Sequence, residues 1–283
     1  MSAPRSVDRL RSLLFAPATN AAVIAKIGTR GADAVVIDCE DATPADLKVA
    51  ARAAARAATP ALASAGAVVT VRVNAPSSEW FADDVATALV SGIAAVAVPK
   101  IERLAELDAT ARLLDAAGLA DVGVIAGIET ALGVADARPL LAHPRVVAGY
   151  FGAEDFIADM GGRRTPGNAE VAYARGRVAL AGRLGGVPVL DQVVTDFGDD
   201  ARFLRESAEA SSMGYAGKLC IHPRQVELAN AAFVPSADEV DRARRLLAAY
   251  AEAQAAGRGA IAFEGQMVDE PLAAQARRIV SQA

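Results

Sequence analysis

The sequence predicts an α/β protein, namely a (β/α)8 TIM barrel with a C-terminal helical extension. Three observations support this prediction: short apolar runs alternate with segments rich in Ala, Arg and Glu, the alternation continues for eight rounds, and it stops near Pro235. Eight consecutive β-α units are typical of a closed barrel, whose usual length is ~250 residues. The 283 residues of the chain leave room for a short addition after the barrel.

The expected strands are short runs in which Val, Ile, Leu and Ala predominate. They span residues 12–17, 34–39, 68–73, 94–98, 122–128, 146–151, 187–193 and 217–221. The helix-like segments between and after them span about 20–30, 46–64, 79–91, 102–117, 131–142, 168–185, 199–213 and 224–231. A doubly wound open sheet is the alternative, but eight units without a Gly-rich dinucleotide-binding loop after the first strand favour the barrel.

The residues after Pro235 form a segment of a different kind. Residues 236–256 are predicted to be a helix, because Ser236 stands at the N-cap and Glu239 follows at the spacing of a capping box. Gly257 and Gly259 should end this helix, an irregular piece should follow them, and a last helix is expected over 271–282. We therefore predict a catalytic barrel over 1–235 and a helical lid or oligomerisation segment over 236–283.

Composition and charge exclude several classes of protein. With 53% hydrophobic residues the chain can bury a large core, and a net charge of -5 with 5% aromatics argues against a nucleic-acid surface. No run reaches the ~18 apolar residues of a membrane helix, and charged residues interrupt the N-terminal apolar run. Cys39 and Cys220 lie far apart without CxxC spacing, so we expect two packed thiols and a cytoplasmic location.

Polar residues follow most of the expected strands, and strand C-terminal ends form the active-site mouth of such a barrel. They are Asp38, Glu40, Asp41, Arg72, Asn74, Lys100, Glu129, Glu154, Asp155, Asp191, Gln192 and His222. If they converge on one mouth, carboxylates outnumber cations there, and like-charge repulsion predicts a bound metal ion. Mg²⁺ favours oxygen ligands, whereas zinc favours His and Cys, and the chain has only two histidines. The prediction is a magnesium site.

The chain also carries eight short motifs in a fixed order. They are RSLLFAP (11–17), GADAVVIDCEDA (31–42), VRVN (71–74), VPK (98–100), IET (128–130), FGAEDF (151–156), GKLCIHPRQ (217–225) and MVDEP (267–271). Together they resemble the citrate lyase β-subunit-like (CitE-like) branch of the HpcH/HpaI aldolase superfamily, which includes malyl-CoA and citramalyl-CoA lyases. This resemblance covers nearly the whole chain.

The resemblance implies a Mg²⁺-dependent carbon-carbon lyase, with Mn²⁺ as the alternative metal. Such an enzyme cleaves a 3-hydroxyacyl-CoA, for example malyl-CoA or citramalyl-CoA, to a keto acid and acetyl-CoA, or forms it by Claisen condensation. By the same resemblance, Glu129 and Asp155 are the metal ligands, and Arg72 grips the carboxylate of the keto-acid part. The backbone of Gly152 and Ala153 lets the keto acid approach closely.

Four further acids receive roles from the resemblance. Glu40 is implied as a catalytic residue that holds metal-bound water or substrate, with Asp38 and Asp41 as supporting acids at the substrate. Asp269 of MVDEP is similar to a catalytic aspartate that reaches the mouth from a neighbouring subunit. The resemblance therefore implies a homo-oligomer, either a trimer or a hexamer.

Each of these assignments has a simpler alternative. As residue types, Glu129 and Asp155 are also compatible with a buried ion-pair network with Arg72 or Lys100. Lys100 is either a Schiff-base lysine, as in metal-free aldolases, or a structural or CoA-facing residue. Asp269 has the position of an ordinary acid at a helix N-terminus.

The loop after the first strand departs from the family pattern. It runs PATNAAVIAK, with Ala18 where relatives carry a glycine and Asn20 and Val23 where arginines are common, so the contacts to CoA phosphates are left unassigned. Two other functions stay open: an aldolase of pyruvate type acting on free hydroxy-keto acids, which the altered loop favours, and a citrate lyase β-like subunit acting on a carrier-bound thioester.

Overall fold

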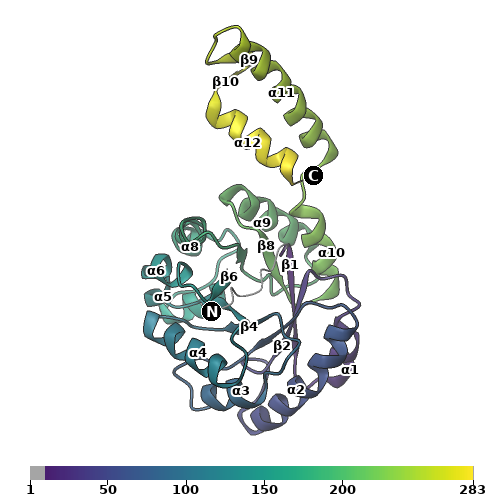
Figure 1. Ribbon diagram of the computed structural model, residues 1–283, viewed down its shortest axis with the longest axis vertical. Helices are drawn as coiled ribbons and strands as arrows, with labels where there is room; N and C mark the ends of the chain where they lie inside the picture. Colours follow the sequence, from purple (N-terminus) through teal and green to yellow (C-terminus); the bar gives the residue numbers. More distant parts are fainter. Residues whose placement is uncertain (1–9, 283) are drawn as a thin grey trace. The chain divides into compact units, whose positions relative to one another are not determined.

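The computed structural model describes residues 10–282 of the protein (Figure 1). The chain divides into two compact units, the first ending at Asn230 and the second beginning at Ala231. The sequence-based boundary lies between residues 235 and 236. Within the described residues, none of the helices combines the length and apolarity needed to cross a membrane.

The first unit is a closed barrel of eight parallel strands arranged in chain order, and helices surround it (Figure 1). The strands are β1 Ser12–Pro17, β2 Ala34–Asp38, β3 Val69–Arg72, β4 Ala95–Val98, β5 Gly123–Ile128, β6 Val146–Phe151, β7 Val189–Asp191 and β8 Gly217–Cys220. Pairing of β1 with both β2 and β8 closes the ring. The predicted (β/α)8 barrel is confirmed.

The helices of the barrel lie close to the predicted segments. They are α1 Ala21–Ile27, α2 Lys48–Ser64, α3 Phe81–Thr87, α4 Leu104–Ala116, α5 Ala131–Ala135, α6 Ala137–Leu141, α7 Ala153–Asp159, α8 Ala172–Gly185, α9 Asp200–Met213 and α10 Pro223–Ala232, with 3-10 turns η1 Ala45–Leu47 and η2 Ala169–Val171. The helix expected over 131–142 is two short helices, and α7 was not predicted at all. At seven residues, α7 is too short to show a helical period in the sequence.

The barrel interior is filled by apolar side chains that alternate along the strands. Leu190 of β7 and Leu219 of β8 belong to this interior cluster, together with Tyr150 of β6. Since successive side chains of a strand point to opposite faces, Asp191 and Lys218 point outward, toward the surrounding helices. This alternation decides which polar residues can reach the mouth.

The second unit contains two helices and a hairpin. Helix α11 Ala237–Ala255 begins with the predicted capping box, in which Ser236 and Glu239 bond each other's backbone N–H groups. The piece expected to be irregular instead forms an antiparallel hairpin of β9 Ile261–Phe263 and β10 Gln266–Val268. Glu264 and Gly265 both adopt positive φ (48° and 80°), as a two-residue type I′ turn requires. Helix α12 Glu270–Ser281 completes the unit and packs on α11.

Candidate active site

A cavity of about 380 Å³ is formed by residues at and just beyond the C-terminal ends of the strands. Its wall includes these predicted site residues: Asp38, Asp41, Arg72, Glu129, Gly152, Ala153 and Asp155. Glu40 is buried beside them and contacts Arg72 and Lys100. The structure therefore brings together every predicted site residue of the first unit.

Arg72 is held in place by an aspartate on the neighbouring strand. Arg72 ends β3 and lies in register with Asp38, which ends β2. Its Nε and Nη2 donate to the two carboxylate oxygens of Asp38 at 2.8 and 2.7 Å, and its guanidinium lies 5.1 Å from the centre of the Phe15 ring. One edge of the Arg72 fork is thus occupied by Asp38. The Nη1 end of the guanidinium forms an ion pair with Glu40 Oε2 at 3.0 Å.

Lys100 connects the acids on both sides of the mouth. It follows β4 with φ of 52°, a conformation unusual for a residue with a side chain, and its backbone N–H donates to Glu129 Oε2 at 2.9 Å. Its Nζ lies 2.5 Å from Glu40 and 3.4 Å from both Asp41 and Asp155.

Burial lowers the pKa of Lys100, but its hydrogen bond to Glu40 and the nearby negative charges outweigh burial and raise the pKa above its ordinary value. A Schiff-base lysine needs an uncharged amine. The geometry therefore favours Lys100 as a counter-charge.

Glu129 has a strongly raised pKa. Its side chain is buried just after β5, and burial, reinforced by the charges of Glu40 and Asp155, raises its pKa to about 7, although Arg72 opposes the shift. Gly152 makes room for it, because a Cβ at residue 152 would lie 2.5 Å from Glu129 Oε1. Burial likewise raises the pKa of Glu40, against the opposing charges of Arg72 and Lys100. The positive charges near Glu40 and Glu129 therefore do not offset the effect of burial and of the neighbouring carboxylates on their pKa values.

These residues fit a magnesium ion. Glu129 and Asp155 supply two hard oxygen ligands to the same cavity, and Mg²⁺ binds through one or two carboxylates while keeping waters or substrate oxygens. Residues 10–282 contain no group of three or more His, Cys, Asp or Glu side chains placed to hold a metal ion, as a structural zinc site would need. A divalent cation would also offset the like charges that raise the pKa of Glu129.

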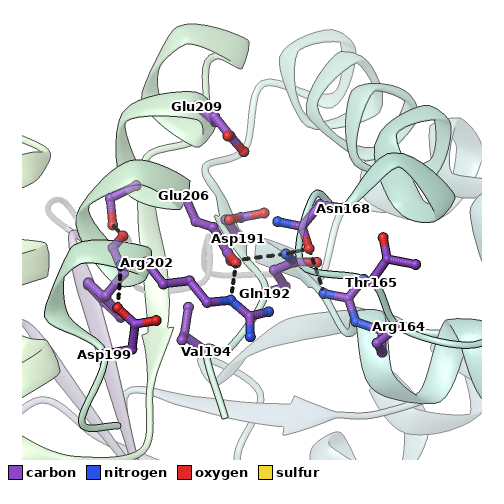
Figure 2. A network of polar contacts seen from close by, with 12 residues as sticks. Arg164, Thr165, Asn168, Asp191, Gln192, Val194, Asp199, Arg202, Glu206 and Glu209 are labelled. Atoms are coloured by element: carbon purple, nitrogen blue, oxygen red, sulfur yellow. Dashed lines mark hydrogen bonds and ion pairs between the residues drawn. The ribbon is translucent and has the colours of Figure 1, made fainter. Parts of the chain in front are cut away.

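Four residues expected at the mouth lie elsewhere. Asp191 points outward and pairs with Arg175 and Lys218. Gln192 donates to Asn168 and Glu206 in the same network, which Figure 2 shows from close by. The reason is strand alternation and the early end of β7, which stops at Asp191.

The other two also face away from the acids. Asn74 is buried between helices α2 and α3, where it contacts Lys48 and Asp84. His222 is exposed and stacks on Phe197, with 5.2 Å between ring centres.

Asp269 lies in the second unit, at the N-cap of α12. Within the described part of the chain its side chain makes no capping hydrogen bond to that helix. The simpler interpretation, an ordinary acid at a helix N-terminus, fits this position, and the catalytic role of Asp269 stays a prediction.

Sequence reasoning missed three residues near the cavity. Phe15 and Tyr150 line it, and Arg164 holds the cavity-lining Glu154 by a 2.9 Å ion pair. The only available signal for Tyr150 was a hydroxyl-bearing residue inside an otherwise apolar strand, in VVAGYF. Arg164 lies in a loop whose path the sequence does not predict.

Comparison with known proteins gives a consistent result. A family model described as HpcH/HpaI aldolase/citrate lyase matches residues 11–223. The chain is 48% identical over 285 residues to a citrate lyase subunit beta-like protein of Deinococcus radiodurans, covering 99% of each. It is 32% identical over 273 residues to a (3S)-malyl-CoA thioesterase of Cereibacter sphaeroides, covering 96% of this chain and 94% of the relative.

The solved structures agree with the sequence relatives. CitE from Mycobacterium tuberculosis, in complex with magnesium, acetoacetate and coenzyme A, superposes with a TM-score of 0.82. The two sequences are 34% identical, and the superposition covers 98% of each chain.

Proposed function

This chain belongs to the HpcH/HpaI aldolase/citrate lyase family, and on that premise we propose that it is a Mg²⁺-dependent carbon-carbon lyase. Its substrate would be a 3-hydroxyacyl-CoA such as malyl-CoA or citramalyl-CoA, and its products a 2-oxo acid and acetyl-CoA. The reverse direction is a Claisen condensation. The observation that carries the proposal is the buried Glu129, whose pKa is raised to about 7 beside Asp155 at a barrel mouth.

Glu129 and Asp155 would hold the metal, with Mn²⁺ as a substitute for Mg²⁺. The bound metal would polarise the oxygens of the 2-oxo-acid part as a Lewis acid. Arg72 would orient the carboxylate of that part through its Nη1 end, while Asp38 fixes the other edge of the guanidinium. The backbone at Gly152 and Ala153 lines the cavity and would let the small acid lie against it.

Cleavage requires two proton movements. A base takes the proton of the 3-hydroxyl group as the bond between C2 and C3 breaks, and the resulting thioester enolate then gains a proton to become acetyl-CoA. We assign this acid-base task to Asp269, delivered from a neighbouring subunit of a trimer or hexamer. Glu40, with Asp41 beside it, would hold a water molecule or the substrate hydroxyl at the mouth.

Three other activities have specific support. The relative named (3S)-malyl-CoA thioesterase favours hydrolysis of the thioester as a second activity. The relatives named citrate lyase subunit beta favour a carrier-bound thioester in place of CoA. The altered loop at Ala18, Asn20 and Val23 favours free hydroxy-keto acids as substrates.

One assay separates these activities. Malyl-CoA, citramalyl-CoA and citryl-CoA are each incubated with the full-length protein, and two products are followed: the 2-oxo acid and free CoA thiol. A lyase releases glyoxylate, pyruvate or oxaloacetate without free thiol, and a thioesterase releases the thiol. Turnover of a free hydroxy-keto acid or only of a carrier-bound thioester would point to the other two activities. Full lyase activity after exhaustive EDTA dialysis would contradict the metal site.

The role of Asp269 is tested by mixing two inactive variants. Asp155→Ala lacks a metal ligand and Asp269→Ala lacks the acid-base group, so each alone should be inactive. Co-assembled subunits should regain part of the activity, because some mouths then carry both wild-type residues. Mixed oligomers that form and stay inactive would place Asp269 in its own subunit's site, and a fully active monomer would remove the need for oligomers.

A further inference from the structure

Tyr150 carries a buried hydroxyl group that lacks a well-aligned hydrogen-bond partner in the described part of the chain. It lies in β6, its side chain is fully buried, and within residues 10–282 its Oη has no hydrogen-bond partner. Arg72 lies near Oη, but no aligned hydrogen bond joins them. Leaving such a donor unpaired destabilises a fold, so its retention calls for a partner that binds from outside.

The hydroxyl lies at the cavity described above. Tyr150 lines this cavity together with Arg72 and Glu129. A second buried atom without a hydrogen-bond partner, Glu40 Oε2, lies 3.0 Å from Arg72 Nη1. Glu40 Oε2 and Tyr150 Oη are therefore both near Arg72, and whereas Glu40 forms an ion pair with Nη1, the hydroxyl is a buried donor that a bound ligand can use.

The position of the phenol is set by its neighbours. Phe15 packs edge-on against the ring at 6.4 Å, and the same Phe15 ring lies against the Arg72 guanidinium. On the adjacent strand, a Cβ at residue 127 would lie 2.5 Å from Oη, so Gly127 is what makes room for the hydroxyl. Tyr150 and Arg72 are thus positioned against one aromatic ring and can act on one ligand.

The hydroxyl is available as a donor. Burial, together with the negative charge of Glu129, raises the pKa of Tyr150 well above its ordinary value, so the phenol keeps its proton. Two carboxylates, Glu40 and Glu129, already supply negative charge nearby, so a neutral donor serves an anionic ligand better here than another acid.

Building on the proposed function, we propose that Tyr150 contacts the substrate by donating a hydrogen bond to the carboxylate of the 2-oxo acid, next to Arg72. The ligand class is a short 2-oxo acid whose carboxylate spans Arg72 Nη1 and Tyr150 Oη. Tyr150 then contributes to recognition of that acid and not to the proton transfers.

The test compares Tyr150→Phe with Tyr215→Phe. Tyr215 is also buried, but its hydroxyl donates to the backbone carbonyl of Arg175, at the outer helices. Pyruvate and glyoxylate binding to the full-length protein with saturating Mg²⁺ is measured by calorimetry, and the melting temperature is measured without ligand. Neither measurement depends on turnover.

The two variants should show opposite patterns. Tyr150→Phe should bind the acids about 10- to 100-fold more weakly, the range for a hydrogen bond to a charged group, with an unchanged or raised melting temperature because an unpaired hydroxyl is removed. Tyr215→Phe should bind normally and melt at a lower temperature.

Wild-type binding that is unchanged in Tyr150→Phe would overturn the role of Tyr150 alone, and would indicate an ordered water as the partner of its hydroxyl. If the wild-type protein binds no 2-oxo acid, the proposed function fails together with this subsite.

Discussion

An arginine–aspartate pair at the barrel mouth has the same geometry as a pair that lies outside the strands. Arg72 holds Asp38 through two hydrogen bonds of 2.8 and 2.7 Å, and Arg175 holds Asp191 through two of 3.0 Å. Each pair is formed by the same two side-chain types. They differ in the charges that surround them.

The outer pair belongs to a balanced network, which we call the outer network; Figure 2 labels Asp191, Arg202, Glu206 and Glu209 of it. Its three acids are Asp191, Glu206 and Glu209, and its three cations are Arg175, Arg202 and Lys218. Burial alone would raise the pKa of Glu206, but Lys218 and the hydrogen bonds from Arg202 and Gln192 lower it to about 2. Each charge in the outer network therefore stabilises the others.

The mouth is not balanced. Five carboxylates (Asp38, Glu40, Asp41, Glu129 and Asp155) meet two cations, Arg72 and Lys100. The pKa values of Glu40 and Glu129 are accordingly raised. The paired charges of the outer network stabilise the fold, whereas the excess negative charge at the mouth requires a cationic ligand. Substitutions at matched positions of the two regions can distinguish an effect on stability from an effect on activity.

The largest effect is expected for Glu129→Gln, which keeps the shape of the side chain and removes a proposed metal ligand. We expect kcat/KM to fall at least ~10³-fold, because the charge stabilisation by a bound metal is worth several kcal/mol. Mn²⁺ binding, measured by EPR, should weaken in parallel. The melting temperature in EDTA should stay the same or rise, since a buried and poorly compensated charge is gone.

The matched control for that change is Glu206→Gln in the outer network. It should lower the melting temperature and leave the kcat/KM of the folded enzyme near the wild-type value. Undiminished turnover in a folded Glu129→Gln protein would mean that Glu129, like Glu206, contributes to the stability of the fold and not to catalysis.

Breaking the outer network should mainly cost stability. Lys218→Met leaves Asp191 and Glu206 buried without their shared cation, and such a loss typically destabilises by about 3–5 kcal/mol. Urea denaturation measures this cost. Lys100→Met, at the partly exposed mouth, should cost less stability, and an equal cost for both lysines would contradict the distinction between the two regions.

A smaller effect on kcat/KM is expected for Arg72→Lys, which keeps the positive charge and loses the planar guanidinium with its two parallel N–H donors. We expect a loss of about 1.5–3 kcal/mol in transition-state stabilisation, a fall in kcat/KM of about 10- to 150-fold. Arg175→Lys makes the same change in the other pair and should alter the melting temperature instead. Near-native kcat/KM in Arg72→Lys would reduce Arg72 to a counter-charge.

The smallest effects concern how the stability of the fold depends on pH, and this dependence has opposite signs for Glu129 at the mouth and Glu206 in the outer network. The folded-state pKa of Glu129, about 7 without metal, lies above its ordinary 4.5, so its contribution to stability is present below pH 4.5 and is lost as pH rises through 7. The folded-state pKa of Glu206, about 2, lies below 4.5, so its contribution is present above pH 4.5 and is lost as pH falls through 2.

Thermal melts in EDTA from pH 3 to pH 8 test this contrast. Relative to wild type, Glu129→Gln should gain stability between about pH 4.5 and pH 7. The loss caused by Glu206→Gln should be constant above about pH 4.5 and shrink below it. The same pH profile for both variants would show that the two regions do not differ in charge balance.

Much of the fold could be predicted because its signals are local. The predicted and observed bounds of β1 and β6 are identical, and the capping box of Ser236 and Glu239 marks the start of α11 in both. The short helix α7 and the hairpin β9–β10 were missed, since seven- and three-residue elements leave no clear period. The mouth acids from Asp38 to Asp155 were expected because each lies at, or within four residues of, the C-terminal end of a predicted strand.

By itself, then, the sequence determined the order of the β-α units and the set of polar residues near their C-terminal ends, because apolar runs and caps are short-range features. Only the tertiary structure decided which of those residues face the cavity. Asp191 ends its strand as Arg72 does, yet it points to the helices, because a side chain's direction depends on the parity of its position in the closed barrel. The unpaired hydroxyl of Tyr150 is also a tertiary property, since Phe15 and Gly127, which position it, come from other strands.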